Sequence, residues 1–204
     1  MARLVVVNHL TLDGVMQAPG RPDEDRRGGF EHGGWSPPYG DAVMGKVMGA
    51  GMAAGAGGAL VFGRRTYEDF ASFWPNQQDD NPFKAVLNER RKYVASTTLR
   101  EPLSWSNSTL LDGDAADAVA TLKERPGEDL TVLGSGELVQ SLMRRNLVDE
   151  YLLTIHPLVL GSGRRLFRDG GAFAALALVE TTPTTTGVVI ARYQPAEPTA
   201  AKTA

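Results

Sequence analysis

The 204-residue chain carries 21 Lys and Arg against 24 Asp and Glu, for a formal net charge of -3, and 42% of its residues are hydrophobic. This balance predicts a globular protein without the overall basic field that attracts nucleic acid. The lack of cysteine excludes disulfides, thiolate zinc sites and thiol catalysis. No apolar run approaches the roughly 20 residues of a membrane helix, and the N-terminal run is too short for a signal peptide. We therefore expect a cytoplasmic protein with no membrane or nucleic-acid partner.

Strands and helices alternate along most of the chain. Continuous apolar runs such as RLVVVN at 3–8 are typical of buried strands, and apolar residues at helical spacing indicate helices between them. In chain order the predicted elements are a strand at 3–8, a helix at 41–57, a strand at 59–62, helices at 66–73 and 83–91, strands at 92–96 and 103–111, a helix at 114–124, a strand at 129–134, a helix at 137–146, and strands at 148–160, 176–184 and 187–194.

Two segments fall outside this alternation. Residues 17–40 are dense in Gly, Pro and charge, and a structureless loop of that length is usually functional or disordered. Residues 195–204 are predicted to be a disordered tail. The remainder, 1–194, is predicted to be one α/β domain with a mostly parallel sheet and antiparallel strands added late. In such sheets, ligands bind beyond the carboxyl ends of the strands.

Three strand ends carry groups suited to phosphate. Gly63-Arg64-Arg65-Thr66 and Gly134-Ser135-Gly136-Glu137 each lead from an apolar strand into a helix, whose N-terminus offers free N–H groups and partial positive charge. Thr66 is placed to cap its helix. The third strand end adds Ser96 and Thr97, with Arg100 nearby. Together the three strand ends suit a long ligand that carries phosphates at both ends of a bridging segment.

Each of these turns also has a purely structural explanation. A glycine between a strand and a helix is more often a tight turn than a binding site. Two arginines at a helix start, however, oppose the helix dipole, which favours an external anion as their partner. Because the GSG segment lacks the full G-x-G-x-x-G fingerprint and comes late in the chain, it argues against a standard Rossmann domain.

Four segments in this order resemble a known family: TLDG, VFGRRTYEDF, VLGSGELVQSLM and VDEYLLTIHPLVLGSGRRLF. The chain resembles the dihydrofolate-reductase-like superfamily, in the branch of the reductase domain of the bifunctional riboflavin-biosynthesis deaminase/reductase. This resemblance implies a three-layer α/β sandwich with a central mixed sheet of about eight strands. It also implies NADPH as the hydride donor and a homodimer.

The resemblance further implies roles for individual residues. The adenosine side of NADPH would contact Gly63, Arg64, Arg65 and Thr66, with Arg64 on the 2′-phosphate and Ser96 and Thr97 assisting. The pyrophosphate would be wrapped by Gly134, Ser135, Gly136, Glu137 and Leu138. The nicotinamide would be bordered by Val7, Asn8, Asp13 and Gly14.

The substrate side is less clearly marked. Asp41 is the candidate catalytic acid, but it is equally suited to be a helix N-cap. Trp35, Tyr39 and His9 are candidate substrate contacts, although a histidine at a strand end commonly satisfies backbone groups. The aromatic residues of 30–35 suit a lid over a ring or a mobile surface loop. The three histidines are scattered, so we expect no metal site.

The sequence thus favours an NADPH-dependent reductase of a small pterin-like or pyrimidine-like heterocycle. Two alternatives stay open: a nucleotide-binding or regulatory module on the same fold without turnover, and the use of a flavin or deazaflavin in place of NADPH.

Overall fold

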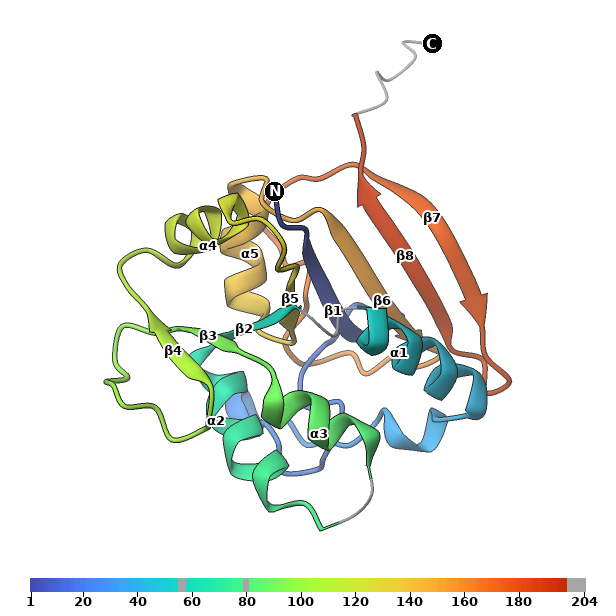
Figure 1. Ribbon diagram of the computed structural model, residues 1–204. Coiled ribbons are helices and arrows are strands. Elements are labelled where there is room, and N and C mark those ends of the chain that lie inside the picture. The colour runs from blue at the N-terminus through green and yellow to red at the C-terminus, as the bar shows by residue number, and fades with distance from the viewer. Residues whose placement is uncertain (55–57, 79–80, 198–204) are drawn as a thin grey trace.

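A computed structural model describes residues 1–54, 58–78 and 81–197. Its centre is an eight-stranded mixed sheet with strand order β4-β3-β2-β5-β1-β6-β8-β7, flanked by helices on both faces (Figure 1). The strands are β1 (Leu4–Thr11), β2 (Ala59–Gly63), β3 (Lys92–Ala95), β4 (Ser108–Leu111), β5 (Leu130–Leu133), β6 (Glu150–His156), β7 (Leu176–Pro183) and β8 (Val189–Pro195). The predicted fold class, a three-layer α/β sandwich, is confirmed.

The first six strands are parallel to one another. β1 lies between β5 and β6, and β2 lies between β3 and β5. β8 pairs antiparallel with β6 and with β7, which forms the far edge. The late antiparallel addition expected from the strand-rich C-terminal part is therefore present. Because β3, β2, β5 and β1 are adjacent and parallel, their carboxyl ends lie side by side at one edge of the sheet.

The helices are α1 (Ala42–Ala54), α2 (Arg64–Phe73), α3 (Pro82–Glu89), α4 (Ala115–Glu124) and α5 (Gly136–Arg144). Alternate residues of β1, such as Leu4 and Val6, pack with Val119 of α4 and Val139 of α5 in the main hydrophobic core. On the opposite face a smaller core, which includes Phe62, joins β2 and β3 to α2 and α3. No helix in the described part of the chain is long and apolar enough to cross a membrane.

Residues 17–40 are packed against the body of the protein. Phe30 and Trp35 are 5% and 7% exposed and form a third apolar cluster with Val15 and Ala18. The Trp35 indole N–H donates to the carbonyl of Gln17 at 2.8 Å. Of the two alternatives for the aromatic residues of 30–35, a lid over a ring or a mobile surface loop, the second does not fit this packing, because these residues find a core of their own.

Several predicted boundaries are corrected. α2 begins at Arg64 with Gly63 as its N-cap, so Thr66 lies inside the helix and is not its cap. β4 is confined to Ser108–Leu111, the end of the predicted strand 103–111. β8 continues through Pro195, and the Ala196 N–H donates to the Ala175 carbonyl, so the predicted tail begins with ordered residues. Residues 55–57 of the predicted helix 41–57, and 198–204 of that tail, lie outside the described residues.

Candidate functional site

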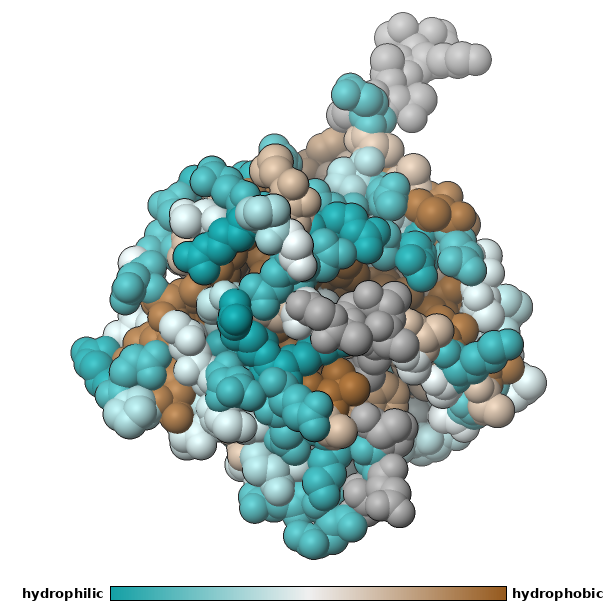
Figure 2. All heavy atoms as spheres, viewed as in Figure 1, coloured by the Kyte–Doolittle hydropathy of each residue, from teal (hydrophilic) through white to brown (hydrophobic). Residues whose placement is uncertain are grey.

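A continuous cleft of about 2350 Å³ lies between α1 and the sheet face that α2 and α3 leave uncovered. Its floor includes Val5, Val7 and His9, which alternate along β1, and Leu152 of β6. Figure 2 views this side of the molecule and shows apolar residues recessed between polar ones. The volume exceeds the usual range for a small-ligand pocket, roughly 300–1,000 Å³, so the cleft has room for a dinucleotide and a second ring.

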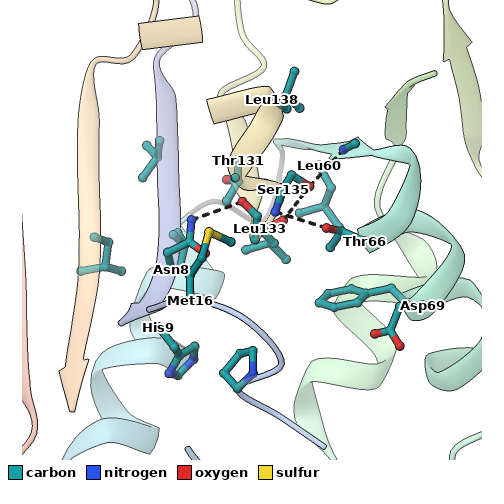
Figure 3. Close-up of a pocket in the computed structure, with 18 of the residues that line it drawn as sticks. Asn8, His9, Met16, Leu60, Thr66, Asp69, Thr131, Leu133, Ser135 and Leu138 are labelled. Carbon is teal, nitrogen blue, oxygen red and sulfur yellow. Dashed lines mark hydrogen bonds between the residues drawn. The ribbon is translucent and has the colours of Figure 1, made fainter. Parts of the chain in front are cut away.

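The two glycine turns predicted to hold phosphate are joined into one structure. The Gly63 N–H donates to the Ser135 hydroxyl at 3.0 Å, and that hydroxyl donates to the Leu133 carbonyl at 3.1 Å. In return, the Ser135 N–H donates to the Thr66 hydroxyl at 3.2 Å (Figure 3). The turns therefore form a single surface at the ends of β2 and β5, and Thr66 serves to join them.

This junction depends on left-handed backbone. Gly134 has φ +58° and Ser135 has φ 56°, a region that costs most residues about 1–2 kcal/mol. A Cβ at Gly134 would also lie 3.3 Å from the methyl of Thr66. The Asn8 side-chain amide donates to the Gly134 carbonyl at 3.2 Å, which fastens the turn to β1. The strain is thus offset by bonds to two neighbouring strands.

The N-terminus of α5 faces this cleft without a cap. Ser135 precedes the helix but makes no side-chain cap bond, so the first-turn N–H groups need another partner. Gly136, Glu137 and Leu138 all line the cleft. Met16 lies close above them, because a Cβ at Gly136 would be 2.6 Å from its sulfur. The geometry suits an anion, such as a pyrophosphate, held by backbone N–H groups.

The two arginines at the start of α2 differ in their hydrogen bonds and ion pairs. Arg64 pairs with Glu68 at 2.9 Å and donates to the Thr98 hydroxyl at 2.7 Å. Arg65 is exposed, lines the cleft, and makes no hydrogen bond or ion pair with any described residue. Arg64 therefore links α2 to the end of β3, where Ser96 and Thr97 also line the cleft.

Glu137 is held by arginines from the segment after β6. Arg168 contacts its carboxylate at 2.9 Å, and Arg164 lies 3.7 Å away. Both arginines line the cleft. They were not identified from the sequence, because nothing there places residues 164–168 beside the start of α5.

The TLDG turn has a structural role. The Asp13 carboxylate accepts the Thr11 hydroxyl at 2.6 Å and the Gly161 N–H at 2.9 Å. The Thr11 hydroxyl and these loop N–H groups lower the pKa of Asp13 to about 2. Neither Asp13 nor Gly14 is among the described residues that line the cleft. In this structure the turn fastens the glycine loop at 161–163, and the expected place of Asp13 and Gly14 beside the nicotinamide stays a prediction.

Asp41 lines the cleft, but its carboxylate is fully engaged. One oxygen accepts the Met44 N–H at 2.8 Å, which is the geometry of an N-cap for α1. The other accepts the N–H and the hydroxyl of Thr185 at 2.7 and 2.6 Å. The Met44 N–H and the Thr185 hydroxyl lower the pKa of Asp41. The structure shows the N-cap that was the alternative for Asp41, and its role as a catalytic acid stays a prediction that these three hydrogen bonds and the lowered pKa do not favour.

A histidine pair lies farther along the same sheet face. His9 Nδ1 and His156 Nε2 are 3.0 Å apart, and the Ser36 hydroxyl lies 3.2 and 3.3 Å from them. Burial lowers the pKa of both imidazoles to about 4. His9 lines the cleft, whereas His156 is fully buried.

Two expected substrate contacts lie elsewhere. Trp35 and Tyr39 place their rings edge-on to His156, with centroids 5.1 and 5.7 Å away. Neither is among the described residues that line the cleft. They pack against His156 on the side away from the cleft. His156 and Ser36 were missed as site residues because His156 is 147 residues from His9 in sequence. Among the described residues, no group of three His, Asp or Glu is placed to hold a metal ion.

Comparisons with solved structures agree with this architecture. A "Putative riboflavin biosynthesis protein" from Shewanella sp. PV-4 superposes with a TM-score of 0.71 at 22% identity, covering 97% of this chain and 100% of that one. A pyrimidine reductase-like protein from Corynebacterium diphtheriae superposes with a TM-score of 0.64 at 12% identity, covering 96% and 92%. At these identities the likeness shows the fold.

Two relatives from Bacillus subtilis (strain 168) are similar in sequence. The uncharacterized protein YyaP is 30% identical over 133 residues, which is 64% of this chain and 70% of YyaP. The uncharacterized protein YwjB is 36% identical over 112 residues, or 54% of this chain and 58% of YwjB. The family model of the RibD C-terminal domain matches residues 2–190. The chain therefore belongs to the RibD C-terminal domain family.

Proposed function

We propose that the protein is an NADPH-dependent reductase that transfers a hydride to a small pterin-like or pyrimidine-like ring bound in the cleft. Membership of the RibD C-terminal domain family and the fold shared with a pyrimidine reductase-like protein support an oxidoreductase role of the riboflavin-pathway type. The cofactor and the substrate are inferred from the site.

The order of the strand ends carries the proposal. Along this edge of the sheet the strands lie in the order β3, β2, β5 and β1. The cleft residues at their ends are, in the same order, Ser96 and Thr97, Arg64 and Arg65, the Gly134–Leu138 turn, and Val7 and His9. Three strand spacings of about 4.8 Å make this row about 14 Å long. A dinucleotide laid along it would place its 2′-phosphate by β3 and β2, its pyrophosphate at α5 and its nicotinamide over β1.

The chain's own residues would bind the cofactor, orient its nicotinamide and shield the ring from water. Uncapped N–H groups of Gly136, Glu137 and Leu138 would hold the pyrophosphate, and Arg65 with Arg64 would hold the 2′-phosphate. Val7 and Leu152 would offer an apolar floor to the nicotinamide, and α1 would cover the ring from above. The bound cofactor supplies the hydride, while the protein sets its position and excludes water.

The cofactor assignment is tested by titrating purified protein with NADPH, NADH and FMN in parallel by calorimetry. We expect NADPH to bind at least tenfold more tightly than NADH, because the arginines gain a phosphate partner. Arg64→Ala with Arg65→Ala should remove that preference and leave NADH binding unchanged. Arg145→Ala is the matched control, since Arg145 is paired with Asp117 outside the cleft.

Each result has a defined meaning. Tight NADPH binding together with NADPH consumption on addition of a pterin or a pyrimidine would support the reductase. Tight binding without consumption by any such ring would favour a nucleotide-binding module. Preferential binding of FMN would replace the nicotinamide cofactor by a flavin.

A further inference from the structure

The histidine pair forms a closed hydrogen-bond triangle with a serine. His9 and His156 lie on the neighbouring parallel strands β1 and β6, where the register aligns His9 with Thr154 and Thr11 with His156. The two imidazoles are therefore diagonal neighbours on one face. Ser36, from the packed loop 17–40, places its hydroxyl within 3.3 Å of both facing nitrogens.

The far side of His156 is closed. The residue is 0% exposed, and the rings of Trp35 and Tyr39 stand edge-on to it. Its Nδ1 is buried without a hydrogen-bond partner. His9 differs, because it is half-buried and lines the cleft, and its Nε2 makes no hydrogen bond with any described residue. The triangle thus has one closed end, at His156, and one end open to the cleft, at His9, which Figure 3 shows among the residues that line the cleft.

This asymmetry selects one arrangement of protons. If His9 Nδ1 donated to His156 Nε2, the single proton of neutral His156 would sit on Nδ1 as a buried N–H without an acceptor. Orphaned buried N–H groups are rarer in proteins than under-satisfied acceptors. The proton of His156 therefore belongs on Nε2, where it donates to His9 Nδ1, and the Ser36 hydroxyl can donate to the same atom. His9 must then carry its own proton on Nε2.

We propose that His156 and Ser36 are positioning residues that hold His9 in its neutral Nε2–H form, and that this N–H is the donor recognising an oxo group or ring nitrogen of the heterocycle in the cleft. The proposal rests on the function proposed above and adds to it the group that reads the substrate. Burial lowers the pKa of both imidazoles to about 4, so at neutral pH His9 offers a hydrogen bond without a charge.

The position of His9 fits such a contact. It follows Val7 and Asn8, and Asn8 is bonded to the Gly134 carbonyl of the phosphate turn. The imidazole therefore lies beyond the place of the pyrophosphate, at the end of the row where the reacting rings would meet. Oxopyrimidines and pterins both carry carbonyl oxygens and ring nitrogens that accept from such a donor. A ring without an acceptor at this place would leave the His9 N–H unpaired once the ring covers it, so the site discriminates against such rings.

The tautomers can be measured directly, because the chain contains only three histidines. Long-range ¹H–¹⁵N spectra of ¹⁵N-labelled protein at pH 7 report which ring nitrogen of each histidine carries the proton. His32 is exposed on the loop and is assigned with a His32→Gln variant. We expect His9 and His156 to be neutral with the proton on Nε2 in both. A His9 proton on Nδ1, or an imidazolium at pH 7, would overturn the proposal.

The contact is tested by adding 5,6-diaminouracil or folate to the protein saturated with NADP⁺. We expect the ¹⁵N signal of His9 Nε2 to shift with the ring that binds, while the signals of His32 stay in place. His9→Phe should weaken that ring at least tenfold and NADP⁺ less than twofold. A ring that binds without moving the His9 signal, or with equal affinity for His9→Phe, would refute the contact, as would failure of both rings to bind.

Two variants of His156 test its role in positioning His9. His156→Phe keeps the volume but removes the donor, so ring affinity should fall three- to tenfold, whereas His156→Gln supplies a side-chain N–H and should restore most of it. A purely structural role would instead lower NADP⁺ affinity and the melting temperature in parallel. Absence of NADPH consumption with an intact His9 shift would sink the reductase and leave the recognition standing, so the two failures are distinguishable.

Discussion

The Ser135 hydroxyl accepts the backbone N–H of Gly63 at 3.0 Å and so ties the end of β5 to the end of β2. Ser135→Ala removes this bond and leaves the Gly63 N–H without its acceptor, which should lower the free energy of unfolding by about 1–2 kcal/mol. Affinity for NADPH should also fall, because the two glycine turns that we propose hold its phosphates are no longer joined. Urea unfolding and calorimetric titration measure the two effects.

Ser135→Gly is the matched control. It also loses the hydroxyl, but glycine adopts φ 56° without the strain that alanine retains, so it should recover about 1 kcal/mol of stability relative to Ser135→Ala. NADPH affinity should stay low in both variants. Equal stability of the two variants would show that the left-handed turn is not strained, and wild-type affinity in either would separate the junction from cofactor binding.

Asp41 should tolerate loss of its charge. Asparagine caps helices as well as aspartate does, so Asp41→Asn keeps the bond from the Met44 N–H and should retain NADPH consumption within about threefold. Asp41→Ala loses the cap and the bonds to Thr185, and should lower the free energy of unfolding relative to Asp41→Asn. Steady-state kinetics and urea unfolding check this. Complete loss of turnover in Asp41→Asn would restore the carboxyl as the proton donor.

The two joined glycine turns were predictable as neighbouring strand ends because their signals are local. Apolar runs that end in Gly63 and Gly134, each followed by a segment with a helical pattern, indicate two strand ends, and parallel strands bring such ends to one edge. The sequence does not reveal that the Thr66 hydroxyl spans to Ser135, 69 residues away. It therefore assigns Thr66 to its own helix, where a threonine after a glycine turn suits an N-cap.

The part of the cleft proposed to hold the substrate was predicted less well because its contacts are long-range. Asp41 and Thr185 are 144 residues apart, and nothing near Asp41 distinguishes a cap from a catalytic acid. His9 and His156 meet only through the register of β1 with β6. Trp35 turns away from the cleft because its indole N–H is satisfied by Gln17 within the loop itself. Such partners become visible only once the strands and the loop are placed.

Gly136→Ala should impair cofactor binding with little effect on folding. An added Cβ would lie 2.6 Å from the Met16 sulfur, and a flexible methionine can move away at low cost. The displaced side chain would then occupy space beside the first turn of α5, so NADPH affinity should fall at least tenfold while the melting temperature changes little.

The double variant Met16→Ala with Gly136→Ala tests that explanation. Removing the methionine clears the contact, so a double-mutant cycle on NADPH affinity should show most of the loss recovered. Additive losses in the cycle would mean that glycine is required at 136 for another reason, such as close approach of the anion to the backbone.

Stability should depend on the histidine pair as the pH falls. Burial and, to a smaller extent, the neighbouring His9 lower the folded-state pKa of His156 from its ordinary value of 6.5 to about 4. Since the unfolded chain binds the proton more readily, the stability contribution is complete above pH 6.5 and is lost as the pH falls toward 4. A shift of this size corresponds to on the order of 3 kcal/mol for the buried imidazole.

The His156→Gln variant isolates this contribution. Urea unfolding at intervals between pH 7.5 and 4 should show a smaller loss for the variant than for the wild type. The comparison is needed because burial raises the pKa values of Glu24 and Asp69. Carboxyl groups with a raised pKa increase the free energy of unfolding of the protein as the pH falls. That opposing effect is common to both proteins and cancels in the difference. Parallel curves for the two proteins would mean that His156 is not held neutral, and the hydrogen-bond triangle would then lack its closed end.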